Sequence, residues 1–260
     1  GDLDDFSLLP IQTLKVENGC EGLIQEAQQK VLHLLGRLFP KENQKNVILW
    51  PALRSLDFTH LYMRENGIPF STLLSECGFL KGVEELNLWG TYIGLEGITL
   101  LAQKSNFNNV WNLNLGNTCY GDDLTVLMDS DIFKNVIELN LSSNGIDNDG
   151  IKPITNGKFS LKKLSVCNNK IGDEGTDHLS KGKATETLTH LNLGSNPVGD
   201  PGVITISKAP FIGNLEKIIF GSWPELITEN SAQAIRDNGE NLKIFEYKYK
   251  HPENLDDYNF

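Results

Sequence analysis

A repeated pattern of apolar residues and asparagine constrains this sequence more than any other feature. Residues 161–175 read LKKLSVCNNKIGDEG, with apolar residues at positions 1, 4, 6 and 11 and asparagine at position 9. Residues 136–150 (VIELNLSSNGIDNDG) and 188–202 (LTHLNLGSNPVGDPG) repeat the same pattern. Because self-similarity at a fixed period of 20–50 residues is the signature of stacked structural repeats, the pattern predicts a solenoid.

Eight units of this kind can be recognised along the chain. Their first apolar residues lie 25 to 30 residues apart, at Leu53, Val83, Val110, Val136, Leu161, Leu188, Leu215 and Leu242. A unit of about 27 residues has room for a short strand and a helix of two to three turns. The return segments 97–102, 124–128 and 231–235 are rich in helix-compatible apolar residues. Each unit is therefore predicted to be a strand followed by a helix.

The first part of the chain follows the pattern only loosely. Residues 11–16 have the apolar spacing of a strand, and residues 21–38 have apolar residues at helical spacing before Pro40. We therefore expect three parts: an N-terminal cap at 1–52 with a degenerate strand and an amphipathic helix, eight repeats at 53–250, and a C-terminal tail at 251–260.

Glycine and aspartate mark the loops that lead into the helices. Three units share the sequences IGLEG, IGDEG and VGDPG, at residues 93–97, 171–175 and 198–202. Asp173 and Asp200 are predicted to cap the helices that follow them, with Pro201 in the first turn. The second glycine is expected to let the helix pack closely on the strands. A calcium loop at 147–150 is the alternative, but the remaining EF-hand ligands are missing, so no metal site is predicted.

LxxLxLxxN units of about 27 residues that lead into an NxIGDEG-like loop resemble the leucine-rich repeat family, and especially its ribonuclease-inhibitor-like subclass. The resemblance covers residues 53–250. It implies an α/β solenoid, a horseshoe with parallel β-strands on the concave face and helices on the convex face. The asparagine at position 9 is expected to bond neighbouring backbone in the middle repeats. Elsewhere it is replaced by Leu61, Thr91, Thr118, Trp223 and Lys250.

Composition excludes several classes of function. A net charge of −11 argues against nucleic-acid binding, which needs a basic surface. The mean hydropathy of −0.26 and the absence of a long apolar run argue against a membrane span. No zinc site or disulfide framework is predicted, because no short CxxC-type spacing occurs among Cys20, Cys77, Cys119 and Cys167. Reduced thiols favour an intracellular location.

Catalytic signals are weak throughout the sequence. No GxSxG, HExxH, Walker A or GxGxxG motif occurs in a supporting context. Cys167 and His190 lie one repeat apart, and a Cys/His-dependent enzyme is the alternative that they leave open. The prediction is that the chain has no catalytic residues and no cofactor.

Candidate binding residues lie at the variable positions of the strands. Because side chains alternate along a strand, positions 3, 5 and 7 are predicted to face away from the core. The predicted partner-binding residues at positions 3 and 5 are Glu85, Asn87, Asn112, Asn114, Glu138, Asn140, Lys163, His190 and Asn192. At position 7, Trp89 is predicted to be exposed beside a glycine-lined floor, and tryptophan is enriched in binding hot spots. Tyr92 and Tyr120 are added as loop aromatics.

The resemblance implies a non-enzymatic protein–protein interaction scaffold that holds another protein on its concave face as a monomer. The Lys- and Asn-rich composition fits two settings, a bacterial effector in a host cell cytosol and an ordinary intracellular scaffold. Binding of a small ligand or a glycan by the asparagines and aromatics is a third possibility.

Overall fold

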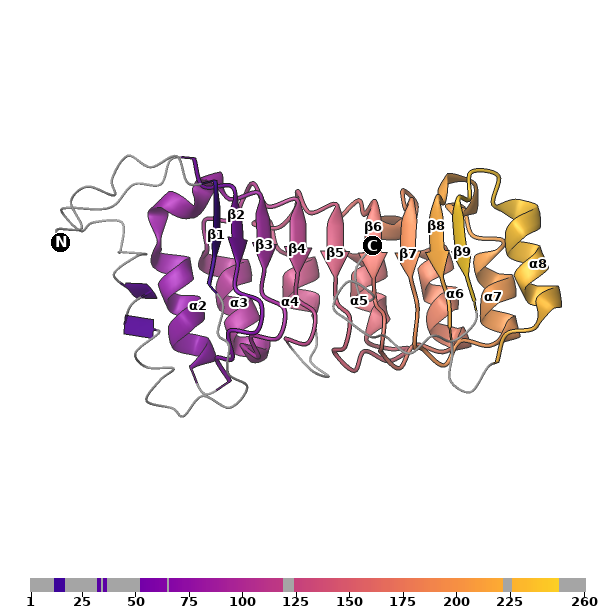
Figure 1. Cartoon of the computed structure of the whole chain (residues 1–260), viewed down its shortest axis with the longest axis horizontal. Helices are drawn as coiled ribbons and strands as arrows, with labels where there is room; N and C mark the ends of the chain where they lie inside the picture. Colours follow the sequence, from indigo (N-terminus) through magenta and orange to yellow (C-terminus); the bar gives the residue numbers. More distant parts are fainter. Residues whose placement is uncertain are drawn as a thin grey trace. The chain divides into compact units, whose positions relative to one another are not determined.

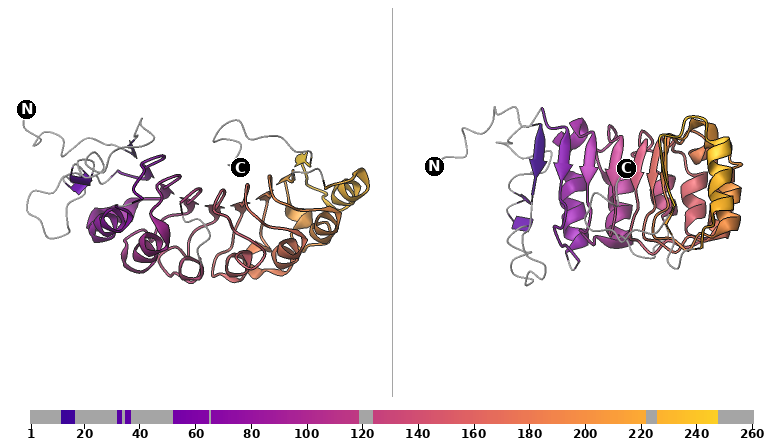
Figure 2. Two further views of the ribbon diagram at one scale, coloured as in Figure 1. Left: turned by 90° about the horizontal axis from the view of Figure 1, so that it is seen from below. Right: turned by 45° about the vertical axis from the view of Figure 1, so that its right-hand side comes forward.

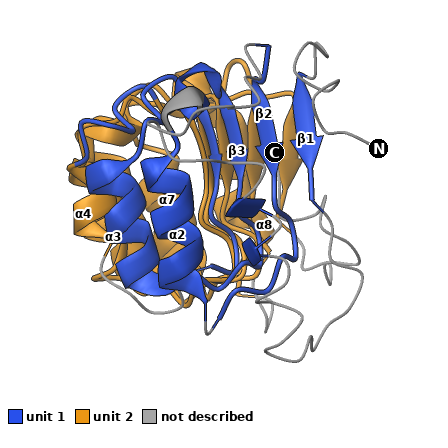
Figure 3. Ribbon diagram, turned by 90° about the vertical axis from the view of Figure 1, so that its left-hand side faces the viewer, with its two compact units in different colours: residues 1–119, 130–135 blue, residues 120–129, 136–260 orange. Residues whose placement is uncertain are grey.

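The computed structural model describes residues 12–16, 32–33, 35–36, 52–64, 66–118, 124–221 and 226–247. The chain forms two compact units (Figure 3). Unit 1 comprises residues 1–119 and 130–135, and unit 2 comprises residues 120–129 and 136–260. Both units are built from the same strand–helix repeat.

Unit 1 has a layer of parallel strands backed by helices. Its elements are β1 (Thr13–Lys15), β2 (Ser55–Asp57), α2 (Gly67–Glu76), the 3₁₀ helix η2 (Gly78–Gly82), β3 (Glu85–Asn87), α3 (Gly94–Lys104) and β4 (Asn112–Asn114). Strand β1 pairs with β2, β2 with β3 and β3 with β4, each time in parallel (Figure 1). Helices α2 and α3 pack against each other on one side of the strands (Figure 2).

Unit 2 repeats this arrangement. Its elements are α4 (Thr125–Met128), β5 (Glu138–Asn140), α5 (Ile151–Asn156), β6 (Lys163–Ser165), α6 (Asp173–Lys181), η3 (Lys183–Thr185), β7 (His190–Asn192), α7 (Asp200–Ile206), η4 (Ile212–Asn214), β8 (Lys217–Ile219), α8 (Glu229–Asn238) and β9 (Ile244–Glu246). Strands β5 to β9 pair in parallel with their neighbours. Helices α4 to α8 pack in chain order on one side of these strands (Figure 2). We call the opposite surface of the strands the sheet face.

The apolar pattern explains this layering. Every predicted repeat contains a strand at positions 3 to 5, counted from its first apolar residue. In the unit that begins at Leu161, the side chains of Leu161, Leu164 and Val166 are fully buried. Because strand side chains alternate, positions 4 and 6 enter the core between strand and helix, and position 3 is left on the sheet face. The predicted solenoid of parallel strands and helices is confirmed.

The asparagine ladder of the middle repeats is present. Asn169 Nδ2 donates to the carbonyl oxygens of Leu141 (3.1 Å) and Val166 (2.9 Å), and its Oδ1 accepts from the backbone N–H of Asn144 (3.0 Å). Asn196 Nδ2 donates to the same Val166 carbonyl at 2.8 Å. Each asparagine therefore satisfies buried backbone groups of its own repeat and of the preceding one.

Threonine takes this role in unit 1. Thr91 Oγ1 donates to the Leu88 carbonyl at 2.8 Å, and Thr118 Oγ1 donates to the Leu88 and Gly116 carbonyls at 2.7 and 2.9 Å. Both threonines are buried. A hydroxyl donates one hydrogen where an amide donates two, so the ladder is sparser here than in the middle repeats.

The helix caps differ from the prediction. Asp173 and Asp200 are the first residues of α6 and α7 and make no cap hydrogen bond within these helices. Asp173 Oδ1 instead accepts from the N–H groups of Gly199 (2.8 Å) and Gly202 (3.0 Å) at the start of α7. Asp200 accepts from the Thr228 N–H (2.7 Å) before α8. The predicted capping within one repeat is wrong, because each carboxylate caps the helix of the next repeat.

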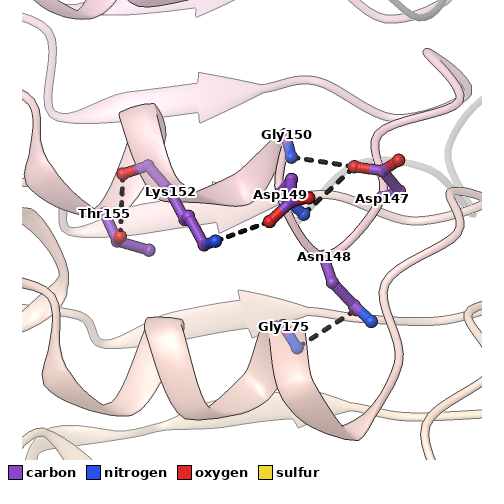
Figure 4. A network of polar contacts seen from close by, with 7 residues as sticks. All are labelled: Asp147, Asn148, Asp149, Gly150, Lys152, Thr155 and Gly175. Atoms are coloured by element: carbon purple, nitrogen blue, oxygen red, sulfur yellow. Dashed lines mark hydrogen bonds and ion pairs between the residues drawn. The ribbon is translucent and has the colours of Figure 1, made fainter.

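Asn148 makes the same kind of cap one repeat earlier. Its Oδ1 accepts from the N–H groups of Gly172 (2.7 Å) and Gly175 (3.1 Å), and the Gly175 bond is drawn in Figure 4. An added Cβ at Gly175 would lie 2.8 Å from Asn148 Oδ1. The second glycine of the loop therefore makes room for the capping side chain of the preceding repeat, and this close approach replaces the predicted packing on the strands.

Parts of the predicted domain organisation lie outside the described residues. The N-terminal strand is observed as β1, and residues 32–33 and 35–36 of the predicted cap helix are helical. The rest of that helix, Trp223 and the tail at 251–260 are not described. A membrane-spanning helix is not found in the described part of the chain, where every helix is too short or too polar.

Candidate binding surface

The predicted binding residues fall in both units. Glu85, Asn87, Trp89, Tyr92, Asn112 and Asn114 belong to unit 1, whereas Glu138, Asn140, Lys163, His190 and Asn192 belong to unit 2. Tyr120 lies outside the described residues. One set therefore belongs to the strands of unit 1 and the other to the strands of unit 2.

Asparagines at position 5 have a structural role. In unit 1, the Oδ1 atoms of Asn87 and Asn114 accept from the N–H groups of Trp89 (3.0 Å) and Gly116 (3.1 Å). These bonds close Asx turns, which carry the chain out of the strand.

The same turns recur in unit 2 with less exposure. Asn140 Oδ1 accepts from the Ser142 N–H at 2.9 Å, and Asn192 Oδ1 accepts from the Gly194 N–H at 2.9 Å. Asn140 is 3% exposed and Asn192 is 2% exposed. The prediction that these two side chains are open to a partner is therefore wrong, because each is folded against its own strand end.

Trp89 is also placed differently from the prediction. Its side chain is 5% exposed, and an added Cβ at Gly116 would lie 2.0 Å from its Cε3 atom. The indole thus covers Gly116 in the next repeat and fills the floor that the sequence suggested was empty. Trp89 is a packing residue, and the predicted exposed tryptophan is not found.

Tyr92 belongs to a small aromatic cluster in unit 1. Its ring stacks on that of Tyr62, with 5.4 Å between centroids, and Tyr62 stacks on His60 at 6.1 Å. Asn117 Nδ2 donates to the Tyr92 hydroxyl at 2.7 Å. Tyr62 and His60 were not predicted, although Tyr62 and Tyr92 occupy the same position 10 of successive repeats. The cluster groups the aromatics that a glycan site would need, and glycan binding stays a prediction.

Position 3 supplies the half-exposed side chains of the sheet face. In unit 1, Glu85 of β3 and Asn112 of β4 are partners in the strand register. In unit 2, the register aligns five residues on adjacent strands: Glu138, Lys163, His190, Lys217 and Ile244. We call these five residues the position-3 row.

Charges in the position-3 row are partly paired. Lys163 Nζ lies 2.8 Å from Glu138 Oε1. Lys217 makes no ion pair with any residue that the structure describes. Glu138 and Lys163 therefore neutralise each other, and positive charge remains at Lys217.

His190 lies between the two lysines. Partial burial of the ring lowers the pKa of His190, and the charges of Lys163 and Lys217 lower it further, while Glu216 and Glu138 act in the opposite direction. His190 Nδ1 lies 3.0 Å from Thr189 Oγ1, so that nitrogen is held by a hydroxyl. The lowered pKa favours the neutral imidazole, whose Nδ1 is engaged by the Thr189 hydroxyl.

The Cys167–His190 pair that a Cys/His-dependent enzyme would need is not formed. In the strand register, His190 aligns with Lys163, whereas Cys167 lies four residues further along the same strand direction. Four residues of strand correspond to about 13 Å, far beyond hydrogen-bond reach. Cys167 is also only 2% exposed. The arrangement contradicts a Cys167–His190 nucleophile.

The Asp147–Gly150 loop is fully engaged in local bonds. Asp147 Oδ1 accepts from the N–H groups of Asp149 (3.1 Å) and Gly150 (2.8 Å), and Asp149 forms an ion pair with Lys152 (Figure 4). The hydrogen bond and charge of Lys152 lower the pKa of Asp149. Asp147 thus stabilises the turn and the start of α5, and Asp149 forms a surface ion pair within the same helix start. No group of three His, Cys, Asp or Glu residues in the described ranges could hold a metal ion.

A groove lies beside the position-3 row, where the chain enters β6 to β9. Its volume is about 400 Å³, and it is lined by Lys162, Thr187, Thr189, Asn214, Glu216, Asn241 and Lys243. Asn214 and Asn241 donate their side-chain N–H groups to the carbonyl oxygens of Glu186 (3.4 Å) and Gly213 (2.6 Å). These bonds fix the groove wall one repeat at a time.

Comparison with known proteins agrees with the repeat pattern. Residues 134–154, 157–177 and 186–207 match a family model described as leucine-rich repeat. The fold is a leucine-rich repeat solenoid. No curated protein matches the chain.

Two solved structures illustrate the likeness. An internalin (inlF) from Listeria monocytogenes is 17% identical with a TM-score of 0.48, and the match covers 90% of this chain and 76% of that chain. The TLR13–ssRNA13 complex is 17% identical with a TM-score of 0.43, and the match covers 85% of this chain and 30% of that chain. The ribonuclease-inhibitor-like subclass stays a prediction.

The leucine-rich repeat pattern could have revealed part of what was missed. Lys217 and Ile244 occupy the same position 3 as Glu138, Lys163 and His190, so alignment of the repeats identifies them. The groove could not be predicted from the alignment of the repeats, because the residues that line it precede the strands and differ in type from repeat to repeat.

Proposed function

We propose that the chain is a non-catalytic binding protein that holds another protein across the sheet face of unit 2. The position-3 row is the observation that supports this proposal. It places charged, imidazole and apolar side chains side by side on five adjacent strands, with Ile244 43% exposed. At about 4.8 Å per strand the row spans about 19 Å, the length of an extended segment of about six residues.

The leucine-rich repeats supply the support for this row. The backbone around it is held by the asparagine ladder, and the position-5 side chains of β5, β6 and β7 are buried. A surface of this kind loses little entropy on binding, because its side chains project from a rigid layer. The effector role and the host-cell location rest on composition alone and stay predictions.

The test is an affinity capture with variants at the two ends of the row. The sheet-face variant combines Glu138→Lys with Ile244→Asp. The matched helix-face variant combines Lys208→Glu with Ile204→Asp, because Lys208 is exposed and has no ion pair in the described part of the chain and Ile204 is 39% exposed on α7. Quantitative mass spectrometry compares the proteins retained by the three forms.

We expect a specific partner to be retained by the wild type and the helix-face variant and lost from the sheet-face variant. Circular dichroism of each form confirms that the fold is intact. Equal loss from both variants, or loss from the helix-face variant alone, would contradict binding on the sheet face.

A further inference from the structure

Positive charge collects at the groove of unit 2, although the chain as a whole is strongly acidic. Lys162 and Lys243 line the groove, and Lys217 follows the groove residue Glu216 directly in the chain. The net charge of the whole chain is −11. A cationic site on such a protein attracts anionic groups at short range, while the rest of the surface repels them.

Two of these lysines are uncommitted. Lys243 Nζ lies 2.7 Å from Glu216 Oε2, and this ion pair holds the pKa of Glu216 below its usual range. Lys162 and Lys217 make no ion pair with any of the described residues. Two ammonium groups are therefore available to a partner, on β8 and just before β6.

The groove offers polar groups between these charges. Thr189 lines the groove on the repeat between Lys162 and Lys217, with its Oγ1 atom 3.1 Å from the Lys162 carbonyl oxygen and 3.0 Å from His190 Nδ1. His190 thus lies next to a groove residue in the chain and is held by it. The charged groups that suit carboxylates at this site are the two lysine ammonium groups.

We infer that the groove and the neighbouring Lys217 receive an acidic segment of the partner protein, with two carboxylates that contact Lys162 and Lys217. This inference rests on the proposed function and names the chemistry of its partner. Lys162 directly precedes β6 and Lys217 begins β8, and these strands are two places apart, a separation of about 10 Å. In a peptide with the polyproline II conformation, which has three residues per turn, carboxylates three residues apart lie on the same side and are separated by about 9 Å. The preferred sequence is therefore Asp or Glu at positions i and i+3.

A long polyanion fits this site less well. Glu138, Glu216 and Glu246 lie on the same strands or next to them and limit the positive surface to a small area. Nucleic-acid binding requires many phosphate contacts over an extended basic surface. A short acidic peptide meets only the two free lysines and the groove.

The experiment measures fluorescence polarisation of labelled peptides with the full chain at low ionic strength. The probe is a Gly/Ser peptide with two Glu residues at positions i and i+3. Its controls carry Gln at both positions, or Glu at positions i and i+1. A labelled single-stranded oligonucleotide tests the alternative anion.

The site variant is Lys162→Glu with Lys217→Glu. The matched control is Lys183→Glu with Lys208→Glu, two exposed lysines of the helix side that make no ion pair with residues in the described ranges. We expect the i, i+3 peptide to bind the wild type and the control variant equally well. The site variant should bind it at least about tenfold more weakly. Added salt should weaken the wild-type interaction.

Equal binding of the Gln peptide, a stronger response to the oligonucleotide, or equal loss in both variants would overturn the acidic-segment proposal. The failure of this proposal can be separated from that of the proposed function. If the captured partner is lost with Glu138→Lys and Ile244→Asp but retained by the Lys162→Glu and Lys217→Glu variant, the sheet face binds a partner and the acidic segment is wrong. If the partner is retained by the sheet-face variant, the proposed function itself fails.

Discussion

At the scale of single residues, Asn169 shows how much one side chain can stabilise a repeat. It is 8% exposed and makes five hydrogen bonds with backbone groups of two repeats. Asn169→Ala leaves these buried groups without partners, so we expect the free energy of unfolding to fall by about 2–4 kcal/mol. Urea denaturation followed by circular dichroism measures the change.

The adjacent Asn168 is the control for this substitution. It is exposed, has a φ of 53° and donates one hydrogen bond to Ser143 Oγ. Asn168→Gly keeps the left-handed backbone accessible, so we expect a change of less than about 0.5 kcal/mol. Equal losses of unfolding free energy from both variants would show that the ladder asparagine stabilises the repeat no more than an exposed asparagine does.

Glycine at position 15 gives a second test at this scale. An added Cβ at Gly202 would lie 2.5 Å from Asp173 Oδ1 and 2.8 Å from Val198 Cγ1, whereas nothing lies within 4 Å of one at Gly213. Gly202→Ala should lower the free energy of unfolding by about 1–3 kcal/mol despite the better helix propensity of alanine. Gly213→Ala should be nearly neutral in the same denaturation experiment, and the reverse order would contradict the steric explanation.

The residue scale is also where prediction from sequence failed most. Strand alternation correctly placed position 3 on the sheet face, but it could not show that Trp89 bends over Gly116. A glycine at position 7 that follows a large side chain at position 7 of the preceding repeat indicates that the large side chain fills the space above the glycine. The asparagines at position 5 and position 9 are the same residue type, and only their hydrogen bonds distinguish strand-end turns from the buried ladder.

At the scale of elements, the starts of α6, α7 and α8 each depend on the repeat before them. Asp173→Ala removes the acceptor for two N–H groups at the start of α7, and we expect a loss of about 1–2 kcal/mol. Asp177→Ala on the same helix removes only an exposed ion pair with Lys181 and should cost about 0.5 kcal/mol or less. Urea midpoints of both variants measure this difference. Equal midpoints would show that Asp173 does not stabilise the helix of the next repeat.

The cap at α8 should respond to pH. The hydroxyl of Ser231 and then the backbone N–H of Thr228 lower the pKa of Asp200. Because the folded-state pKa lies below the unfolded one, the stabilisation is complete above the unfolded pKa of about 4 and is lost as pH falls through the folded-state pKa. Asp200→Asn should therefore be less stable than wild type at pH 6, with a difference that shrinks below pH 3.

Glu240→Gln provides the comparison for this pH experiment, because Glu240 is exposed and has no described partner. Urea midpoints measured at both pH values should give the same small difference for Glu240→Gln. An Asp200→Asn effect that is independent of pH would show that the carboxylate charge does not support the cap.

Elements were predicted better than their contacts. The apolar pattern located each strand, because positions 1, 4 and 6 are buried together in the seven repeats that begin at Leu53 to Leu215, whereas those of the last repeat are half-buried. The loop sequences indicated helix starts, and α6 and α7 begin at the predicted aspartates. Which helix each aspartate caps depends on how neighbouring repeats stack. The pattern within one repeat does not indicate how far its aspartate lies from the helix of the next repeat.

At the scale of the whole molecule, effects of substitutions should depend on the distance between repeats. Asn169 and Asn196 share the Val166 carbonyl as acceptor. A double-mutant cycle with Asn169→Ala and Asn196→Ala should therefore deviate from additivity by at least about 0.5 kcal/mol. Asn144→Ala and Ser231→Ala are separated by several repeats and should be additive within about 0.5 kcal/mol. Additivity of the neighbouring pair would contradict a shared ladder.

Caps that reach forward by one repeat also give the chain a direction of assembly. Asn148 serves α6, Asp173 serves α7 and Asp200 serves α8, always towards the C-terminus. A chain that leaves the ribosome N-terminus first therefore offers each new helix an acceptor on a repeat that has already been made. Helix capping in this order needs no later segment, so the order of synthesis and the order of helix capping coincide, whereas each ladder asparagine reaches back to the preceding repeat.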